Sequence, residues 1–139
     1  MKRYWFILLC LMALTSCQDK IEQVTGSYSY KVSGTAVVDS SSVALRDEQG
    51  AMELIRVEGE NMLLTFNALR GAAYAAKGTL SDQTLTLLPF DKSVSAGINE
   101  YNVTVTGTGT VYSNTILFDL TYESEELTAE KVTMICKKN

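Results

Sequence analysis

Two long segments of the chain alternate apolar and polar residues, and this alternation limits the folds that the chain can adopt. The first segment runs from Tyr28 to Val38 and the second from Tyr101 to Val111. A period of two places the apolar side chains on one face of an extended strand, whereas a helix repeats every 3.6 residues. Threonine fills most polar positions of the second segment and suits the pleated surface of a strand. Both segments are therefore predicted to be long, half-buried β-strands.

Shorter apolar runs separated by turn residues predict further strands. Tight hairpins are expected at residues 59–61 and 47–50, and an acidic loop is expected at residues 123–130. Eight or nine strands in a chain of 139 residues predict a single all-β domain. The shorter predicted strands are 43–46, 52–58, 62–66, 74–80, 84–88, 116–122 and 131–137.

Glycines inside the predicted strands favour a closed barrel over a sandwich of two sheets. Gly34, Gly78, Gly107 and Gly109 each fall within an apolar run, and glycine permits the sharp bend by which a strand coils around a small barrel. Closure also removes the exposed strand edges that promote aggregation. The predicted fold is a small antiparallel meander barrel of about eight strands, spanning residues 26–139.

The beginning of the chain has the pattern of an export signal. Two basic residues precede an apolar run from Tyr4 to Leu14, which is shorter than the roughly 20 residues needed to span a bilayer. The run ends in Leu14-Thr15-Ser16-Cys17, which resembles the lipobox of bacterial lipoproteins. This resemblance implies that residues 1–16 are a signal peptide cleaved before Cys17, and that Cys17 carries the lipid.

A lipid on Cys17 predicts a location in the cell envelope. Two or three acyl chains, at about 0.8 kcal/mol per buried methylene group, anchor a protein to its membrane permanently. Residues 17–25 are polar and are predicted to be a short tether between the lipid and the barrel. The expected location is the outer membrane, with the domain on either the periplasmic or the outer face.

The residue composition excludes most kinds of chemistry. The chain has no histidine, the side chain used most often as a catalytic base and as a transition-metal ligand. Its net charge of −4 removes the electrostatic basis for binding nucleic acid. Glu123, Glu125 and Glu126 lack the ligand spacing of a dedicated calcium loop. We therefore expect no catalytic site, no metal site, no cofactor and no nucleic-acid partner.

Cys136 is predicted to be a buried and unreactive thiol. Cys10 lies in the predicted signal peptide and Cys17 is the predicted lipid site, so no partner for a disulfide remains in the chain. Cys136 is also in phase with Val132 and Met134 on an apolar face. A cysteine buried among apolar side chains is generally inert.

Inward-facing aromatic residues define a candidate ligand pocket. A barrel of eight strands is just wide enough either to be filled by side chains or to hold one small ligand, and the sequence leaves both possibilities open. Tyrosine suits a cavity because it combines an apolar ring with a polar hydroxyl group. The candidate pocket residues are Tyr28, Tyr30, Phe66, Tyr101, Phe118 and Tyr122.

Three local patterns occur together in the predicted barrel. Gly26-Ser27-Tyr28 opens the first strand, two hairpins contain Gly78-Thr79 and Gly109-Thr110, and the strand Tyr101 to Val111 lies near the end. With these features the chain resembles the calycin-like β-barrel domain of small lipoproteins of the Bacteroidaceae. The resemblance covers Val24 to about Tyr122 and implies a lipocalin-like barrel, but it assigns no catalytic or binding residue. Residues 131–137 depart from it, and either close the barrel or pair at an edge.

Three functions are compatible with a non-catalytic, lipid-anchored barrel. The first is the binding of a small apolar or amphipathic molecule inside the barrel, as calycins commonly do. The second is a protein-binding or inhibitor module that acts through a surface loop, with residues 91–100 and 67–73 as candidate loops. The third is a structural component of the envelope.

The Cys17→Ala substitution should release the protein from membranes, because it removes the predicted site of acylation. Separation of membranes from soluble protein, followed by immunodetection, measures this release. Cys10→Ala leaves the predicted lipid site intact and should remain with the membranes. If the Cys17→Ala variant also remains there, the lipoprotein interpretation is wrong.

Overall fold

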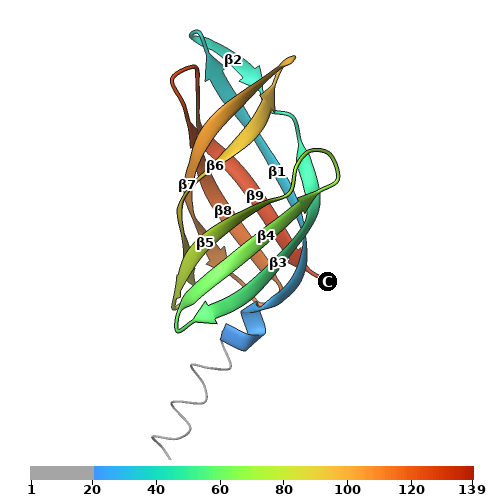
Figure 1. The fold of residues 1–139 in the computed structure, drawn as a ribbon, viewed down its shortest axis with the longest axis vertical. Coiled ribbons are helices and arrows are strands. Elements are labelled where there is room, and N and C mark those ends of the chain that lie inside the picture. The colour runs from blue at the N-terminus through green and yellow to red at the C-terminus, as the bar shows by residue number, and fades with distance from the viewer. Residues whose placement is uncertain (1–20) are drawn as a thin grey trace, which may run out of the picture.

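The computed structural model describes residues 21–139, which form one closed antiparallel β-barrel (Figure 1). The predicted signal peptide and Cys17 lie outside the described residues. Eight strands form the wall and β2 is an additional short strand paired with β1, so the predicted all-β meander barrel is confirmed. The strands are β1 (Gly26–Val38), β2 (Ser41–Ala44), β3 (Glu48–Glu58), β4 (Asn61–Ala68), β5 (Tyr74–Ser81), β6 (Thr84–Ala96), β7 (Asn99–Val111), β8 (Thr115–Glu123) and β9 (Leu127–Lys138).

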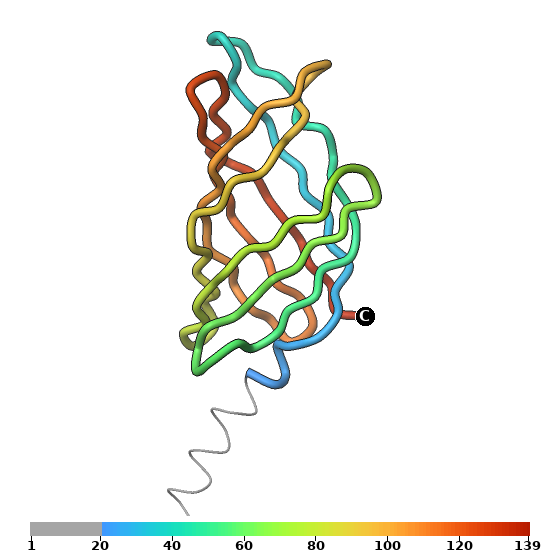
Figure 2. Tube along the Cα trace, in the orientation of Figure 1, coloured from blue at the N-terminus to red at the C-terminus, as the bar shows by residue number. Residues whose placement is uncertain are grey.

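The barrel closes because the first strand pairs with the last. From β3 to β9 each strand pairs with the next one along the chain, as the tube in Figure 2 shows, and β1 pairs with both β3 and β9. The β1–β9 ladder extends from Tyr28 opposite Lys138 to Val38 opposite Leu127. Strand β9 therefore closes the barrel, which decides between the two alternatives for residues 131–137.

Side chains that alternate inward along the strands fill the lower part of the barrel. We call the end with the turns at residues 59–60, 82–83 and 112–114 the lower end, and the opposite end the upper end (Figure 1). On β1 the inward residues are buried, while the polar residues between them are exposed. The largest fully buried side chains include Tyr28, Met52, Met62, Phe66 and Phe118.

Strand β6 separates from β5 part-way along the barrel, and the chain's single proline marks the position. β6 pairs with β5 only from Thr84 to Leu87, although its ladder with β7 continues to Ala96. The β6–β7 register shifts between Leu87 and Phe90, around Pro89. Proline has no N–H to donate and is found at bulges and strand edges. Above the bulge, β6 therefore continues its ladder with β7 and no longer pairs with β5.

A short segment after β2 connects the upper end of β6 to the opposite side of the barrel. Leu45 forms an isolated antiparallel bridge with Ala96, and the Arg46 N–H donates a hydrogen bond of 2.9 Å to the Ser95 carbonyl oxygen. The β4–β5 loop at residues 69–73 lies lower, part-way along the barrel (Figure 1). The backbone pairing of the wall is thus interrupted between this loop, the start of β3 and the upper half of β6.

Two segments predicted as loops are largely strand. Residues 91–100 form the upper parts of β6 and β7 with a tight turn between them, because the β6–β7 ladder continues past the bulge. The acidic loop predicted at residues 123–130 is reduced to a turn at residues 124–126. There the Ser124 hydroxyl oxygen accepts a hydrogen bond from the Leu127 N–H over 3.0 Å, so the chain reverses within a few residues.

The hairpin predicted at residues 59–61 is confirmed, and the one predicted at residues 47–50 is wrong. Gly50 lies inside β3 opposite Tyr30. An added Cβ at Gly50 would lie 2.1 Å from the Asn67 carbonyl oxygen, so this glycine serves a close approach between strands. The hairpin occurs instead at Asp39 and Ser40, which both have positive φ angles, as a two-residue turn that follows the strand twist requires.

A helical turn at residues 21–24, in the segment predicted as a tether, lies against the lower end of the barrel (Figure 1). Its last residue, Val24, is buried, and the Tyr28 hydroxyl group donates a hydrogen bond to the Val24 carbonyl oxygen. Within residues 21–139, no helix has the length and apolar character needed to cross a membrane.

Gly107→Ala should destabilise the barrel by about 2 kcal/mol, since an overpacked side chain forces the backbone to shift. An added Cβ at Gly107 would lie 2.3 Å from the Asp119 carbonyl oxygen of β8. Urea unfolding of residues 18–139, followed by far-UV circular dichroism, measures the change and should show a β-type spectrum. Thr108→Ala, at an exposed position of the same strand, should change stability by less than about 0.5 kcal/mol. Equal stability of the two variants would contradict the close packing of β7 on β8.

Candidate functional site

A cavity of about 540 Å³ lies where the backbone pairing of the wall is interrupted. Its volume is within the range of roughly 300–1,000 Å³ that is typical of small-molecule sites. Residues 45–48 line one side and residues 91–95 of β6 line another. The remaining lining residues are Val32, Glu100, Tyr122 and residues 70–74. The cavity therefore lies beside the upper half of β6, and the buried side chains Tyr28, Met62 and Phe118 do not line it.

An ion pair with a tyrosine forms the polar side of this cavity. The Lys92 Nζ donates a hydrogen bond of 2.7 Å to Glu48 Oε1, and the Tyr74 hydroxyl group donates one of 2.5 Å to Glu48 Oε2. The side chain of Lys92 is 5% exposed and that of Glu48 is 20% exposed. We call Glu48, Tyr74 and Lys92 the Glu48 cluster. Both carboxylate oxygens of Glu48 accept hydrogen bonds within it.

Aromatic rings hold the Lys92 ammonium group in place. Its Nζ lies 4.2 Å from the ring centroid of Tyr74 and 5.8 Å from that of Tyr122. Tyr74 stacks in turn on Phe66, with centroids 4.7 Å apart, and on Phe90, with centroids 6.0 Å apart. A cation over the face of an aromatic ring is attracted by the ring quadrupole. The rings thus compensate part of the hydration that Lys92 loses inside the barrel.

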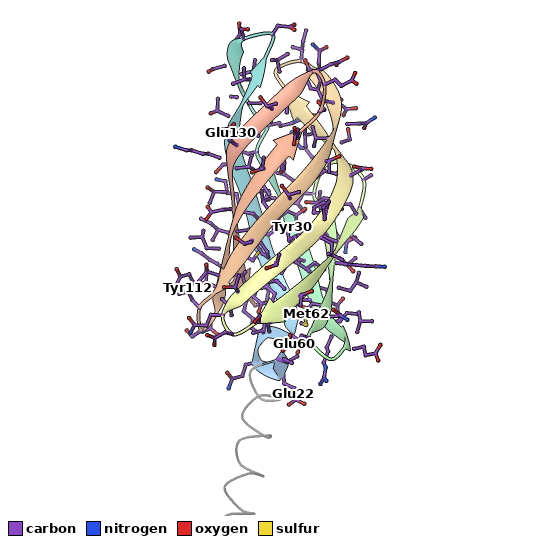
Figure 3. The ribbon with its side chains drawn as sticks, turned by 90° about the vertical axis from the view of Figure 1, so that its left-hand side faces the viewer. Glu22, Tyr30, Glu60, Met62, Tyr112 and Glu130 are labelled. Atoms are coloured by element: carbon purple, nitrogen blue, oxygen red, sulfur yellow. The ribbon has the colours of Figure 1, made fainter. Side chains whose placement is uncertain are left out.

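The Tyr30 hydroxyl group is a buried polar group next to the Glu48 cluster. Tyr30 lies near the middle of the barrel (Figure 3), and its ring meets Phe66 edge-on at 5.2 Å. Burial, and then the negative charge of Glu48, raise the pKa of Tyr30. Glu48 and Tyr74 are near enough to affect this pKa, yet the Tyr30 hydroxyl oxygen makes no well-formed hydrogen bond within residues 21–139. A buried hydroxyl group without a hydrogen bond lowers the free energy of unfolding by about 1–3 kcal/mol.

Burial decides the protonation of the phenols around the cavity. It raises the pKa values of Tyr74 and Tyr122, and the charge of Glu48 raises both further. Burial lowers the pKa of Lys92, while the nearby Glu48 carboxylate opposes this shift. At neutral pH the tyrosines therefore keep their protons and act as hydrogen-bond donors. The arrangement suits the binding of a polar group more than the transfer of a proton.

The Glu48 cluster was missed by sequence reasoning, although a signal for it is present. Lys92 is in the same two-residue phase as the apolar Phe90 and Val94, and Glu48 is in phase with Met52. A charged residue at an inward position of a strand is expensive to bury unless it is paired. Two such residues of opposite charge predict an internal ion pair.

The candidate pocket residues have different roles in the structure. Tyr122 lines the cavity, and Tyr30 and Phe66 lie behind it in contact with the aromatic rings. Tyr28 and Phe118 are buried and do not line this cavity. The Phe118 ring lies over Gly109 of β7. Tyr101 is only half-buried, opposite Val94 on β6.

The loop predicted at residues 67–73 borders the cavity. Residues 67 and 68 complete β4, and Arg70, Gly71, Ala72 and Ala73 line the cavity. Leu69 points away from the core and is 75% exposed. The small residues leave the space beside Tyr74 open.

Cys136 is a free thiol, fully buried within the described chain. Burial raises its pKa to about 12, so almost no reactive thiolate exists at neutral pH. Within residues 21–139, no three cysteine, aspartate or glutamate side chains are grouped so that they could hold a metal ion.

Comparison with known proteins identifies no family. No family model matches the chain, and no curated protein matches it. A solved structure described as a redesigned beta barrel is similar to it, with 16% sequence identity and a TM-score of 0.48. The alignment covers 86% of this chain and 94% of that chain.

Removing both partners of the internal ion pair should cost less stability than the sum of the costs of removing each partner alone. Glu48→Gln leaves the Lys92 charge unpaired and should cost about 2 kcal/mol, because an unpaired buried charge is strongly unfavourable. The double variant Glu48→Gln/Lys92→Met should regain at least about 1 kcal/mol relative to the sum of the single variants. Urea unfolding of residues 18–139 measures the stability of Glu48→Gln, of Lys92→Met and of the double variant.

Glu53→Gln is the matched control for this cycle, because Glu53 lies on the same strand and is exposed. It makes the same change of charge and should shift stability by less than about 0.5 kcal/mol. Additive effects of the two single variants would show that Glu48 and Lys92 do not stabilise each other.

Proposed function

We propose that this protein is a lipid-anchored envelope lipoprotein whose calycin-like barrel binds a small apolar or amphipathic molecule. The single observation that carries the proposal is the cavity of about 540 Å³ beside the Glu48 cluster. Small-molecule sites generally combine apolar walls with a few well-placed polar groups. The lipobox at Cys17 supports the anchor at the outer membrane.

The lining of the cavity supports an amphipathic ligand. Val32, Leu45 and Val94 supply buried apolar surface, and Glu48 and Lys92 supply a largely buried polar end. The exposed part of the lining is charged, with Arg46, Asp47, Arg70, Asp91 and Glu100. A molecule with an apolar body and one polar group therefore finds a counterpart for each part. Burial of its apolar surface contributes about 25 cal/mol per Å² before the costs of association.

The chemistry of the cluster supports binding without catalysis. The one amine deep in the cavity, on Lys92, is hydrogen-bonded to Glu48 and covered by two tyrosine rings. Histidine, the usual proton-transfer group at neutral pH, does not occur in the chain. The tyrosines hold their protons firmly because burial raises their pKa values.

A protein-binding or inhibitor role is the second candidate, and two exposed residues favour it. Ile98, at the tip of the β6–β7 hairpin, is fully exposed. Leu69, on the β4–β5 loop, is 75% exposed. Large apolar side chains at projecting tips can insert into a partner surface.

Native mass spectrometry of residues 18–139, incubated with a lipid and metabolite extract of the native envelope, should show a discrete bound mass. Val94→Trp places a large ring in the cavity and should reduce the bound fraction at least about tenfold, since it removes the space for the ligand. Ala75→Trp is the control, because Ala75 is exposed on β5 and does not line the cavity.

A spectrum with only the unliganded mass would contradict small-molecule binding. A bound mass that Val94→Trp and Ala75→Trp reduce equally would also contradict it. Capture of an envelope protein that Ile98→Ser abolishes would then support the second candidate.

A further inference from the structure

Lys92 and Tyr122 leave hydrogen-bond donors unused on the largely buried side of the cavity. The Lys92 ammonium group has three N–H bonds, one of which donates to Glu48. Tyr122 lines the cavity, and its hydroxyl group makes no hydrogen bond with another described residue. Both Glu48 oxygens already accept hydrogen bonds, from Tyr74 and Lys92. An acceptor atom on a ligand that reaches this cluster can therefore take hydrogen bonds from Lys92 and Tyr122.

The charges at this position are already balanced. Lys92 and Glu48 are in contact at 2.7 Å and both are largely buried. A carboxylate beside Lys92 would also approach the Glu48 carboxylate, and an ammonium group beside Glu48 would approach Lys92. The other charged residues of the lining are exposed: Arg46, Asp47, Arg70, Asp91 and Glu100. A third charge placed beside Lys92 and Glu48 would therefore lose its hydration without a buried partner of its own, which is costly.

From these two observations we infer that the cavity selects molecules whose polar end is an uncharged hydrogen-bond acceptor, a carbonyl or hydroxyl group. Carboxylates and amines with the same apolar body are disfavoured. The acceptor oxygen receives hydrogen bonds from Lys92 and Tyr122, while the apolar body packs against Val32, Leu45 and Val94. This inference rests on the proposed function, because it assigns the class of molecule that the cavity binds.

Glu48 is the residue that sets this selectivity. It neutralises Lys92, and without it the ammonium group would be a free cation at the end of an apolar cavity. A free, partly desolvated cation would pair with a carboxylate through a charge-assisted hydrogen bond. Selection against carboxylates should therefore depend on Glu48 and on no glutamate of the outer surface.

Isothermal titration of residues 18–139 at pH 7.5 with four compounds of equal chain length tests the inference. The compounds are 2-octanone, 1-octanol, octanoate and octylamine. The ketone and the alcohol should each bind at least about tenfold more tightly than the acid and the amine, a difference of about 1.4 kcal/mol. Octanoate or octylamine binding as tightly as the ketone would overturn the inference and leave the proposed function intact.

The Glu48→Gln variant provides a second test, because it should remove the selection against carboxylates. Relative to 2-octanone, octanoate should gain at least about tenfold in affinity, because Lys92 is then unpaired. Glu53→Gln makes the same charge change on the exposed face of β3, so it should keep the preference of the unsubstituted protein. Equal shifts in the two variants would show a long-range effect of net charge and overturn the role of Glu48.

If none of the four compounds binds, the molecule bound from the envelope extract tests the inference independently. A bound mass identified as a molecule with a charged end at the cavity would overturn the inference. One identified with a carbonyl or hydroxyl end would support it. If neither the compounds nor the extract gives a bound species, the proposed function itself fails, and the inference fails with it.

Discussion

The antiparallel ladder between β1 and β9 is the constraint on which the rest of the structure depends. It joins the first and last strands and turns a sheet with two free edges into a continuous wall. Once closed, the wall removes water from the inward faces, so that Tyr28, Phe66 and Phe118 can pack together. Closure also brings Glu48 of β3 opposite Lys92 of β6, two strands that are not neighbours in the sheet.

The break in the wall coincides with a single feature of the sequence. Around Pro89 the β6–β7 register shifts, and beyond it β6 no longer pairs with β5. An unpaired strand edge invites pairing with another chain, and proline together with inward-pointing charge counters this tendency. Pro89 and Lys92 supply both features. The same interruption borders the cavity, so protection of the edge and the cavity have one structural origin.

The ion pair inside the barrel is not explained by stability alone. Two buried charges often contribute less than apolar residues of the same volume, because their lost hydration offsets their attraction. The barrel nevertheless keeps Lys92 and Glu48 in contact, surrounds the ammonium group with Tyr74 and Tyr122, and leaves the Tyr30 hydroxyl group without a well-formed hydrogen bond. Polar groups kept at this cost beside a cavity are expected where a ligand is recognised.

The sequence by itself determined the class of fold, because strict alternation along Tyr28–Val38 and Tyr101–Val111 is compatible only with long half-buried strands. It also narrowed the possible catalytic mechanisms, since a chain without histidine lacks the commonest general acid and base. Only the tertiary structure decided that β9 closes the barrel, that Tyr28 and Phe118 fill it, and that the cavity lies beside Lys92. The physical reason is that alternation assigns each side chain to a face, whereas the partners across the barrel depend on strand order, register and the bulge at Pro89, which are long-range properties.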